Sequence, residues 1–264
     1  MLGAIAGDVI GSAYEFDPVK SVTFPLFSEH SRFTDDTVLT AAVAVVLLDG
    51  GDYAVALRDF GRRHPERGYG GLFRTWLLDP ALGPYDSYGN GSAMRVGPVG
   101  LAGDSAEAVL REARRSAEVT HSHPEGIRGA QSVALAVFLA KQGADKRTIR
   151  ARVEAHSGYD LGRSVAEIRP SYRFDESCQG SVPEALCCFL EARDYEGAVR
   201  LAISLGGDAD TMAAIAGSVA APFYGGVPAA IAAPVRALLT PELRGIVDRF
   251  DARYGGTARA GTAE

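Results

Sequence analysis

The sequence predicts an all-α fold, and three observations support that prediction. Long runs of the 264-residue chain are alanine-rich or place apolar residues three to four positions apart, which is the period of an amphipathic helix. Alternating apolar and polar runs, which are typical of strands, are nearly absent. Segments rich in glycine and proline, at 67–71, 79–100 and 206–209, separate long helical runs. We therefore expect one helical domain over residues 1–255 with functional loops, followed by a tail over 256–264 that frays.

The helical elements follow in chain order. The first, Thr37–Asp49, is almost wholly apolar, so we expect it to be buried on nearly every side. Ser105 then caps a helix that continues to Val119. Alanine loses no side-chain entropy on forming a helix, and alanine-rich runs predict five more, over Gly126–Gln142, Val182–Arg193, Tyr195–Leu205, Thr211–Tyr224 and Pro228–Leu239. A first-turn proline begins the last helix, Pro241–Tyr254.

The composition excludes several classes of protein. With 47% hydrophobic and 23% charged residues, the chain is an ordinary globular one rather than a disordered one. A formal net charge of −6 and few lysines give no basic patch, so we expect no nucleic-acid partner. Three cysteines, two of them adjacent, suit neither a disulfide framework nor a zinc site and favour a reducing compartment. The chain has no basic signal-peptide region and no run of about 20 apolar residues, so we expect a soluble, cytoplasmic monomer with no membrane partner.

Two short motifs place aspartate and threonine where a helix begins. The first is TDDT at residues 34–37, and the second is GGDADT at residues 206–211. Helix capping explains either motif taken alone, because both residue types are preferred at helix N-termini and a negative charge suits the positive end of the helix dipole. Capping needs only one side-chain oxygen per helix, however. These motifs together supply four carboxylates and three hydroxyls.

The surplus of acids indicates a metal site. The helices that follow both motifs are too apolar to lie at the surface, and carboxylates near a protein interior are costly unless they are neutralised. Mg²⁺ and Mn²⁺ favour carboxylate and hydroxyl oxygens, and four aspartates would hold two such ions if the motifs meet in space. Glu15 is a fifth acid. It is either an exposed acid at a helix end or a ligand or proton-transfer group at the same centre.

These motifs and shorter ones between them, taken in order, resemble the ADP-ribosylglycohydrolase family, which includes DraG-type enzymes and ADP-ribosyl-acceptor hydrolases. The resemblance runs through 7–15, TDDT, RGYG at 67–70, SYGNGSAMR at 87–95, TH at 120–121, SVP at 181–183 and GGDADT. It implies an orthogonal all-α bundle around a binuclear centre of two Mg²⁺ ions, with Mn²⁺ as a substitute. The metal ligands that it implies are Glu15, Thr34, Asp35, Asp36, Asp208, Asp210 and Thr211. Glu15 or Asp36 would activate water or protonate the leaving atom.

The segment Gly89-Asn90-Gly91 has a physical interpretation of its own. Its glycines permit positive φ and a close approach of backbone N–H groups, which suits a diphosphate, although a tight turn before Met94 explains them as well. The resemblance implies that this loop cradles the diphosphate of ADP-ribose and that Tyr88 packs near the adenine. The substrate-binding residues that it implies are Gly68, Gly70, Ser87, Tyr88, Gly89, Asn90, Gly91, Ser92, Met94 and His121.

Two basic residues beside this loop each admit two roles. His121 follows the helix that Ser105 caps, and a histidine there is commonly structural because the negative end of the dipole favours it. The resemblance instead places His121 against the ribose and phosphate of the ligand. Arg95 is either a phosphate-binding or a structural cation.

The resemblance implies hydrolysis of the bond between the anomeric carbon of ADP-ribose and an acceptor, through an oxocarbenium-like state. The partners would be ADP-ribose and ADP-ribosylated proteins or small molecules. The motifs around Glu15, at 67–70 and at 87–91 look closer to the serine-type branch, whose members also act on O-acetyl-ADP-ribose. Arginine-linked substrates of the DraG type are the alternative, as is a non-catalytic ADP-ribose-binding module. A structural protein, like the lens crystallins derived from this family, would require lost ligands.

Overall fold

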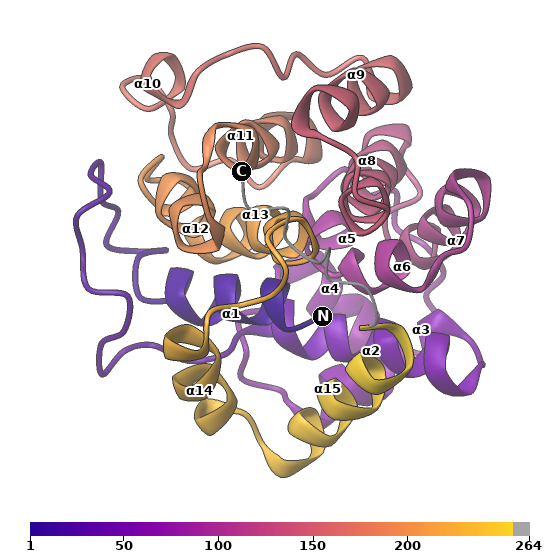
Figure 1. Ribbon diagram of the computed structural model, residues 1–264. Helices are drawn as coiled ribbons and strands as arrows, with labels where there is room; N and C mark the ends of the chain where they lie inside the picture. The colour runs from indigo at the N-terminus through magenta and orange to yellow at the C-terminus, as the bar shows by residue number, and fades with distance from the viewer. Residues whose placement is uncertain (256–264) are drawn as a thin grey trace.

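The computed structural model describes residues 1–255, and within that range the chain forms helices and loops with no named strand (Figure 1). The tail expected over 256–264 lies outside the described residues. An isolated bridge pairs Gly89 with Ser177. The all-α, single-domain prediction is confirmed. The helices, in chain order, are α1 (Leu2–Gly11), α2 (Asp35–Asp49), α3 (Tyr53–Arg63), α4 (Gly71–Leu78), α5 (Gly91–Met94), α6 (Gly97–Ala102), α7 (Ala106–Glu118), α8 (Pro124–Lys141), α9 (Lys146–Ser157), α10 (Val165–Ile168), α11 (Cys178–Glu191), α12 (Tyr195–Ile203), α13 (Ala209–Phe223), α14 (Ala229–Leu238) and α15 (Pro241–Tyr254).

Each predicted helix is present with differences at its ends, whereas α1, α3, α4, α9 and α10 were not predicted. The helix α11 begins at Cys178 rather than Val182, because the Ser177 side chain caps it by accepting a hydrogen bond from the N–H of Gly180. Pro183 therefore lies inside the helix and not in its first turn. The glycine- and proline-rich segment over 79–100 is not loop throughout, since α5 forms within it and α6 begins at Gly97. Glycine and proline there stand at helix starts, where both are tolerated.

The helix α13 lies near the centre of the molecule, between α11 and α1 (Figure 1), and it is buried from Ala209 to Ala220. The helix α1 packs against it through a stripe of glycines, Gly3, Gly7 and Gly11, one turn apart. A Cβ atom on Gly7 would lie only 2.1 Å from the carbonyl oxygen of Ala213. Because no side chain fits between them, the two backbones touch, and residues at the C-terminal end of α1 lie beside the N-terminus of α13.

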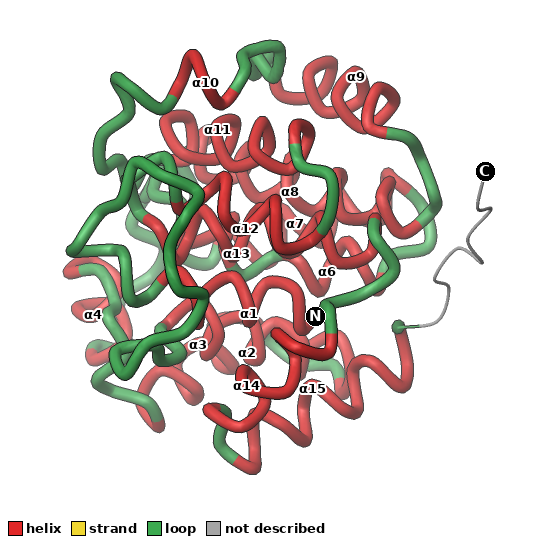
Figure 2. Tube along the Cα trace, turned by 60° about the vertical axis from the view of Figure 1, so that its left-hand side comes forward, coloured by secondary structure: helices red, strands yellow, loops and turns green. Residues whose placement is uncertain are grey.

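The helix α2 is the second buried helix, as its composition predicts. It is buried from Asp36 to Ala44 and packs against α1, α3, α6 and α15. Within the described residues, no helix combines the length and the apolar character that crossing a bilayer requires. Several long loops gather on one side of the helical body, next to α4, while others run along the opposite edge (Figure 2).

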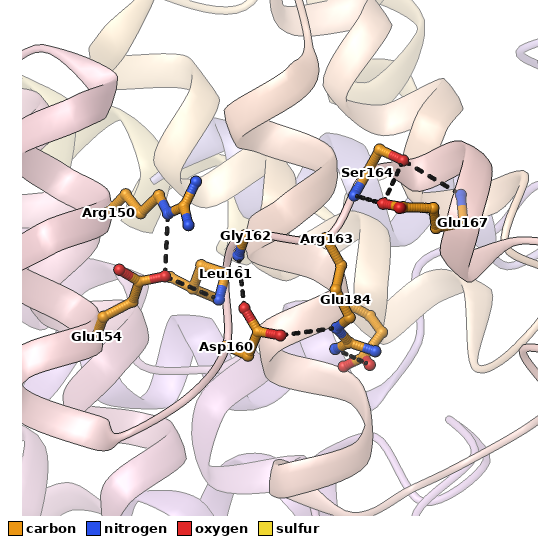
Figure 3. Close-up of polar contacts among 9 residues, drawn as sticks. All are labelled: Arg150, Glu154, Asp160, Leu161, Gly162, Arg163, Ser164, Glu167 and Glu184. Carbon is orange, nitrogen blue, oxygen red and sulfur yellow. Dashed lines mark hydrogen bonds and ion pairs between the residues drawn. The ribbon is translucent and has the colours of Figure 1, made fainter.

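The segment between α9 and α11 is fixed by polar contacts across the surface of α11 (Figure 3). Glu154 of α9 accepts a hydrogen bond from the backbone N–H of Leu161 at 3.1 Å. Arg163 donates to Glu184 of α11 at 2.6 Å and lies 3.8 Å from Asp160. The chain after α9 is therefore tied to α11, the helix that follows Glu176, a residue that borders the cavity described below.

Candidate active site

Acidic side chains from three helices converge on the N-terminus of α13. Carboxylate oxygens of Asp8, Asp36 and Asp210 lie within 4.8 Å of one another, and so do those of Glu15, Asp208 and Asp210. Asp210 belongs to both groups, so the two groups share one side chain. The structure thus brings together acids that are far apart in the sequence, in an arrangement suited to two cations.

Asp36 carries the clearest observation in favour of a metal. It is 3% exposed, and its Oδ1 atom has no hydrogen-bond partner. The hydroxyls of Thr34 and Thr211 each lie 3.4 Å from its other oxygen, Oδ2. A buried carboxylate oxygen without a donor is costly unless a cation neutralises it. Carboxylate and hydroxyl oxygens are also the donor set that Mg²⁺ and Mn²⁺ prefer, so the residues present fit such an ion.

Asp35 lies in neither carboxylate group, although it borders the same cavity. Its backbone N–H donates to the carbonyl oxygen of Arg67 at 2.7 Å, which holds the loop before α4 against the start of α2. Gly68 follows with φ of +97°, and a Cβ atom there would lie 3.4 Å from Asp35 Oδ1. The close approach of this loop therefore places the Asp35 carboxylate on the Gly68 side of the cluster.

Asp8 also lies in the acid cluster, although no role for it was predicted from the sequence. It is fully buried in α1 and accepts hydrogen bonds from the N–H and the hydroxyl of Thr34 at 3.0 and 2.7 Å. It also accepts from the N–H of Thr37 at 3.1 Å and from its hydroxyl. One carboxylate of α1 thereby fixes the first turn of α2. An aspartate in the middle of the apolar run LGAIAGDVIG was the available signal, because a buried charge needs partners.

Burial raises the pKa of every carboxyl group in the cluster. The pKa of Asp8 rises to about 6; that of Glu15 rises to about 7, through burial and the neighbouring Asp208. The pKa of Asp210 rises to about 8 through burial and the charge of Glu15. Burial and the charge of Asp210 hold the pKa values of Asp36 and Asp208 well above their usual range. Without a cation beside it, the cluster therefore keeps protons at a pH where free carboxyl groups are ionised.

These pKa shifts predict that the metal-free protein loses stability as the pH rises. Each carboxyl binds its proton more tightly in the folded chain, so the stabilisation is complete below the unfolded value of about 4 and is lost as the pH passes the folded values. Between about pH 5 and pH 8 we expect the free energy of unfolding to fall by at least about 2 kcal/mol. Denaturant unfolding with a chelator measures this fall, and added Mg²⁺ should reverse it. A free energy of unfolding that rises steadily over this pH range in the presence of the chelator would contradict the prediction.

A cavity of about 250 Å³ opens beside the acid cluster. The acids form one wall, and the loops before α4 and α5 form the other. Most of the predicted substrate-binding residues border it, namely Gly68, Gly70, Ser87, Gly89, Asn90, Gly91, Met94 and His121. The cavity is also bordered by residues for which no motif in the sequence predicted a role, namely Leu39, Leu72, Phe73, Tyr85 and Glu176. Arg95 also borders it, from beneath the loop.

The Gly89-Asn90-Gly91 loop is joined directly to the acid cluster. The side-chain amide of Asn90 donates to Asp208 Oδ2 at 2.8 Å and to Ser181 Oγ at 3.2 Å. Neither glycine adopts the positive φ that the sequence analysis had considered. Their importance is steric, because a Cβ atom on Gly91 would lie 3.1 Å from His121 Nε2. The loop therefore lies against the histidine ring and presents its backbone to the cavity.

Two of the predicted substrate-binding residues do not border the cavity. Tyr88 is 54% exposed, and its ring packs edge-on against His123 at a centroid distance of 5.5 Å. Ser92 is fully buried and donates to the carbonyl oxygen of Gly126 at 2.7 Å. The helix α5 starts at Gly91, and successive helical residues point in different directions, so Ser92 faces α8 while Gly91 and Met94 border the cavity.

The sequence and the fold of this chain are similar to those of known proteins. The family model described as ADP-ribosylglycohydrolase matches residues 1–259. Human ADP-ribosylhydrolase ARH3 is 30% identical over 305 aligned positions, which cover 85% of this chain and 84% of the human protein. ADP-ribosylarginine hydrolase Tri1 of Pseudomonas putida strain GB-1 is 29% identical and is covered over 69% of its length. A solved structure of an ADP-ribosylglycohydrolase-related protein complex superposes with a TM-score of 0.72 at 28% identity, covering 96% of this chain and 95% of that one.

Proposed function

The chain belongs to the ADP-ribosylglycohydrolase family, and from that premise we propose that it removes ADP-ribose from serine-linked and O-acetyl-linked acceptors with the help of two divalent cations. The family prediction made from the sequence is confirmed, and hydrolysis of ADP-ribosyl linkages follows from it. The preferred acceptor and the metal dependence are parts of the proposal. The observation that supports the metal is the unpartnered, buried Oδ1 of Asp36 within a cluster of converging acids.

The residues that would hold the cations come from the loop after α1 and from the first turns of α2 and α13. Bound there, two Mg²⁺ ions, or Mn²⁺ in their place, supply the Lewis acidity that orients ribose hydroxyls and acidifies water. Asp8 belongs to the first carboxylate group, and it also positions the ligand Thr34, because its oxygens accept hydrogen bonds from the N–H and hydroxyl of that residue. The proposed ligands are Glu15, Thr34, Asp35, Asp36, Asp208, Asp210 and Thr211.

Glu15 is the carboxyl group that we assign to proton transfer, with Asp36 as the alternative. Glu15 is half-buried at the border of the cavity, so both water and the leaving atom reach it. Asp36 borders the cavity too, but it is only 3% exposed, and the hydroxyls of Thr34 and Thr211 lie 3.4 Å from its Oδ2. A general acid or base must lie within hydrogen-bond reach of the atom that it serves, and this criterion favours Glu15.

The other wall of the cavity would bind ADP-ribose itself. The Gly89–Gly91 backbone and His121 lie together there, and they suit the diphosphate. Asn90 joins this loop to Asp208, so a ligand on the loop is held at a fixed distance from the acids. Tyr88 stands exposed just outside the cavity and offers an aromatic face on which adenine can stack.

The serine-type preference is supported by the length over which the relatives match. Human ARH3 is covered over 84% of its length, whereas the arginine hydrolase Tri1 is covered over 69% at nearly the same identity. The similarity to Tri1 nevertheless makes arginine-linked ADP-ribose the second candidate substrate.

A substrate panel tests the proposal. Serine-linked and arginine-linked ADP-ribosyl peptides and O-acetyl-ADP-ribose are each incubated with the protein in Mg²⁺, in Mn²⁺ or in a chelator, and released ADP-ribose is measured by chromatography. We expect release from the serine-linked and O-acetyl-linked substrates, at least about tenfold faster than from the arginine-linked one, and loss of release in the chelator. Preference for the arginine-linked peptide would favour the second candidate. If the protein binds ADP-ribose but hydrolyses none of these substrates, it is a non-catalytic ADP-ribose-binding module.

A further inference from the structure

Arg95 is a buried cation for which the proposed reaction supplies no role. It is 0% exposed at the end of α5, and its Nη2 atom donates to the carbonyl oxygen of Ser116 at 3.1 Å and to Thr120 Oγ1 at 2.9 Å. Its Nε and Nη1 atoms are buried and have no hydrogen-bond partner. Burial lowers the pKa of Arg95 to about 10, so the group keeps its charge at neutral pH. Burying a charge without full hydrogen bonding costs free energy, so we expect the guanidinium to orient or polarise the groups beside it.

The hydroxyl of Thr120 lies between Arg95 and His121. Its oxygen accepts from Arg95 Nη2 and lies 2.7 Å from His121 Nδ1. Arginine can only donate, so the hydroxyl proton of Thr120 cannot go to Arg95. A buried hydroxyl needs an acceptor for its proton, and an unprotonated Nδ1 is the acceptor within reach. Thr120 therefore donates to Nδ1.

This arrangement leaves the ring proton of His121 on Nε2. Burial and the charge of Arg95 lower the pKa of His121 well below its usual value, so the ring is neutral. Nε2 faces the loop before α5. A Cβ atom added to Gly91 would lie 3.1 Å from Nε2, and one added to Gly89 would lie 3.6 Å from it. His121 borders the cavity at this point. A single N–H donor thus points toward the surface where the loop presents its backbone.

We propose that Arg95 and Thr120 are positioning residues that keep neutral His121 in its Nε2–H form, so that it donates a hydrogen bond to an anionic group seated on Gly89 and Gly91. The unpaired charge of Arg95 lies beneath the same loop and attracts that anion. Identifying the anion as the diphosphate of ADP-ribose rests on the proposed function. The state of the His121 ring does not, because it follows from contacts within this chain.

The ring state is measured by long-range ¹H–¹⁵N correlation spectra of the metal-free full chain, labelled at its five histidines. A His121→Gln variant assigns the signal. We expect the Nε2–H pattern at neutral pH in the wild type and in Thr120→Ser, which keeps the hydroxyl. Thr120→Val has nearly the same shape without the hydroxyl, and we expect it to show a mixture of both neutral forms. An Nδ1–H or doubly protonated ring in the wild type, or an unchanged ring in Thr120→Val, would overturn the proposal.

The effect on ligands is measured by calorimetry with Mg²⁺ present, using ADP-ribose and adenosine as probes. Loss of an oriented donor to a charged acceptor weakens binding about tenfold, so Thr120→Val should bind ADP-ribose about tenfold more weakly than the wild type. Thr120→Ser should stay within about twofold, and adenosine, which has no phosphate, should bind all three proteins equally. Equal affinity of Thr120→Val and wild type for ADP-ribose would overturn the donor role. A wild type that binds no ADP-ribose would instead reject the proposed function, while the spectra still decide the state of the ring.

Discussion

Asp210→Asn is expected to lower hydrolysis of ADP-ribosyl bonds by at least about a thousandfold while making the metal-free protein more stable. Asp210 is the carboxylate that both acid groups share, so the change affects both proposed cations. Losing several kcal/mol of transition-state stabilisation corresponds to about three powers of ten in rate. Asparagine keeps an oxygen to accept the 2.9 Å hydrogen bond from the N–H of Thr211, and it removes a charge that its acidic neighbours repel.

The two effects are measured together, as release of ADP-ribose and as the unfolding midpoint with a chelator. Asp104→Asn is the matched control, because Asp104 is exposed and lies outside the acid groups. It should change neither quantity appreciably. An Asp210→Asn protein that retains most of its activity would remove Asp210 from the catalytic centre. An Asp210→Asn protein that is less stable than the wild type in the chelator would show that other groups of the protein neutralise the Asp210 carboxylate.

Gly7→Ala is the second substitution with a large expected effect, this time on folding. The added Cβ atom would lie 2.1 Å from the carbonyl oxygen of Ala213 and 2.7 Å from the N–H nitrogen of Ala214. Both are backbone atoms of α13, so no side chain can turn aside, and α1 must move away from α13. We expect a loss of at least about 3 kcal/mol in the free energy of unfolding, despite the better helix propensity of alanine.

Gly245→Ala provides the control for this prediction. Gly245 is an exposed residue within α15, and a Cβ atom there would meet nothing within 4 Å. Alanine should stabilise that helix by about 0.5–1 kcal/mol. Chemical denaturation of the two variants beside the wild type gives both values. A Gly7→Ala protein as stable as the wild type would mean that the two helices do not touch through their backbones.

Burial explains which parts of the fold could be predicted from the sequence. The helices α2 and α13 are buried and alanine-rich, so composition alone identified them. The helix α9, KRTIRARVEAHS, was missed because only Ile149 and Val153 are buried apolar residues in it, which gives too few points to define a period. The helix α6 was missed because Gly97 and Pro98 at its start are residues that usually indicate a loop.

The residues of the candidate site likewise fall into those that the sequence predicted and those that depend on how the helices pack. The surplus of acids in TDDT and GGDADT was visible in the sequence, because capping cannot use so many oxygens. The role of Asp8 was not visible, because its partners Thr34 and Thr37 meet it only when α1 packs beside α2. The burial of Ser92 depends on the direction of one helical turn, and no motif specifies that direction.

The glycine stripe of α1 has a consequence for how the centre is assembled. Helices in direct main-chain contact cannot separate or slide without breaking the interior, so the oxygens carried by α1 and α13 are already in position before any ion arrives. The work of gathering like charges is therefore done during folding, and an ion bound as we propose would relieve repulsion without having to reorganise the protein. We infer that the centre is preorganised, and that the proposed ions would be exchanged or removed while the helices around it keep their arrangement.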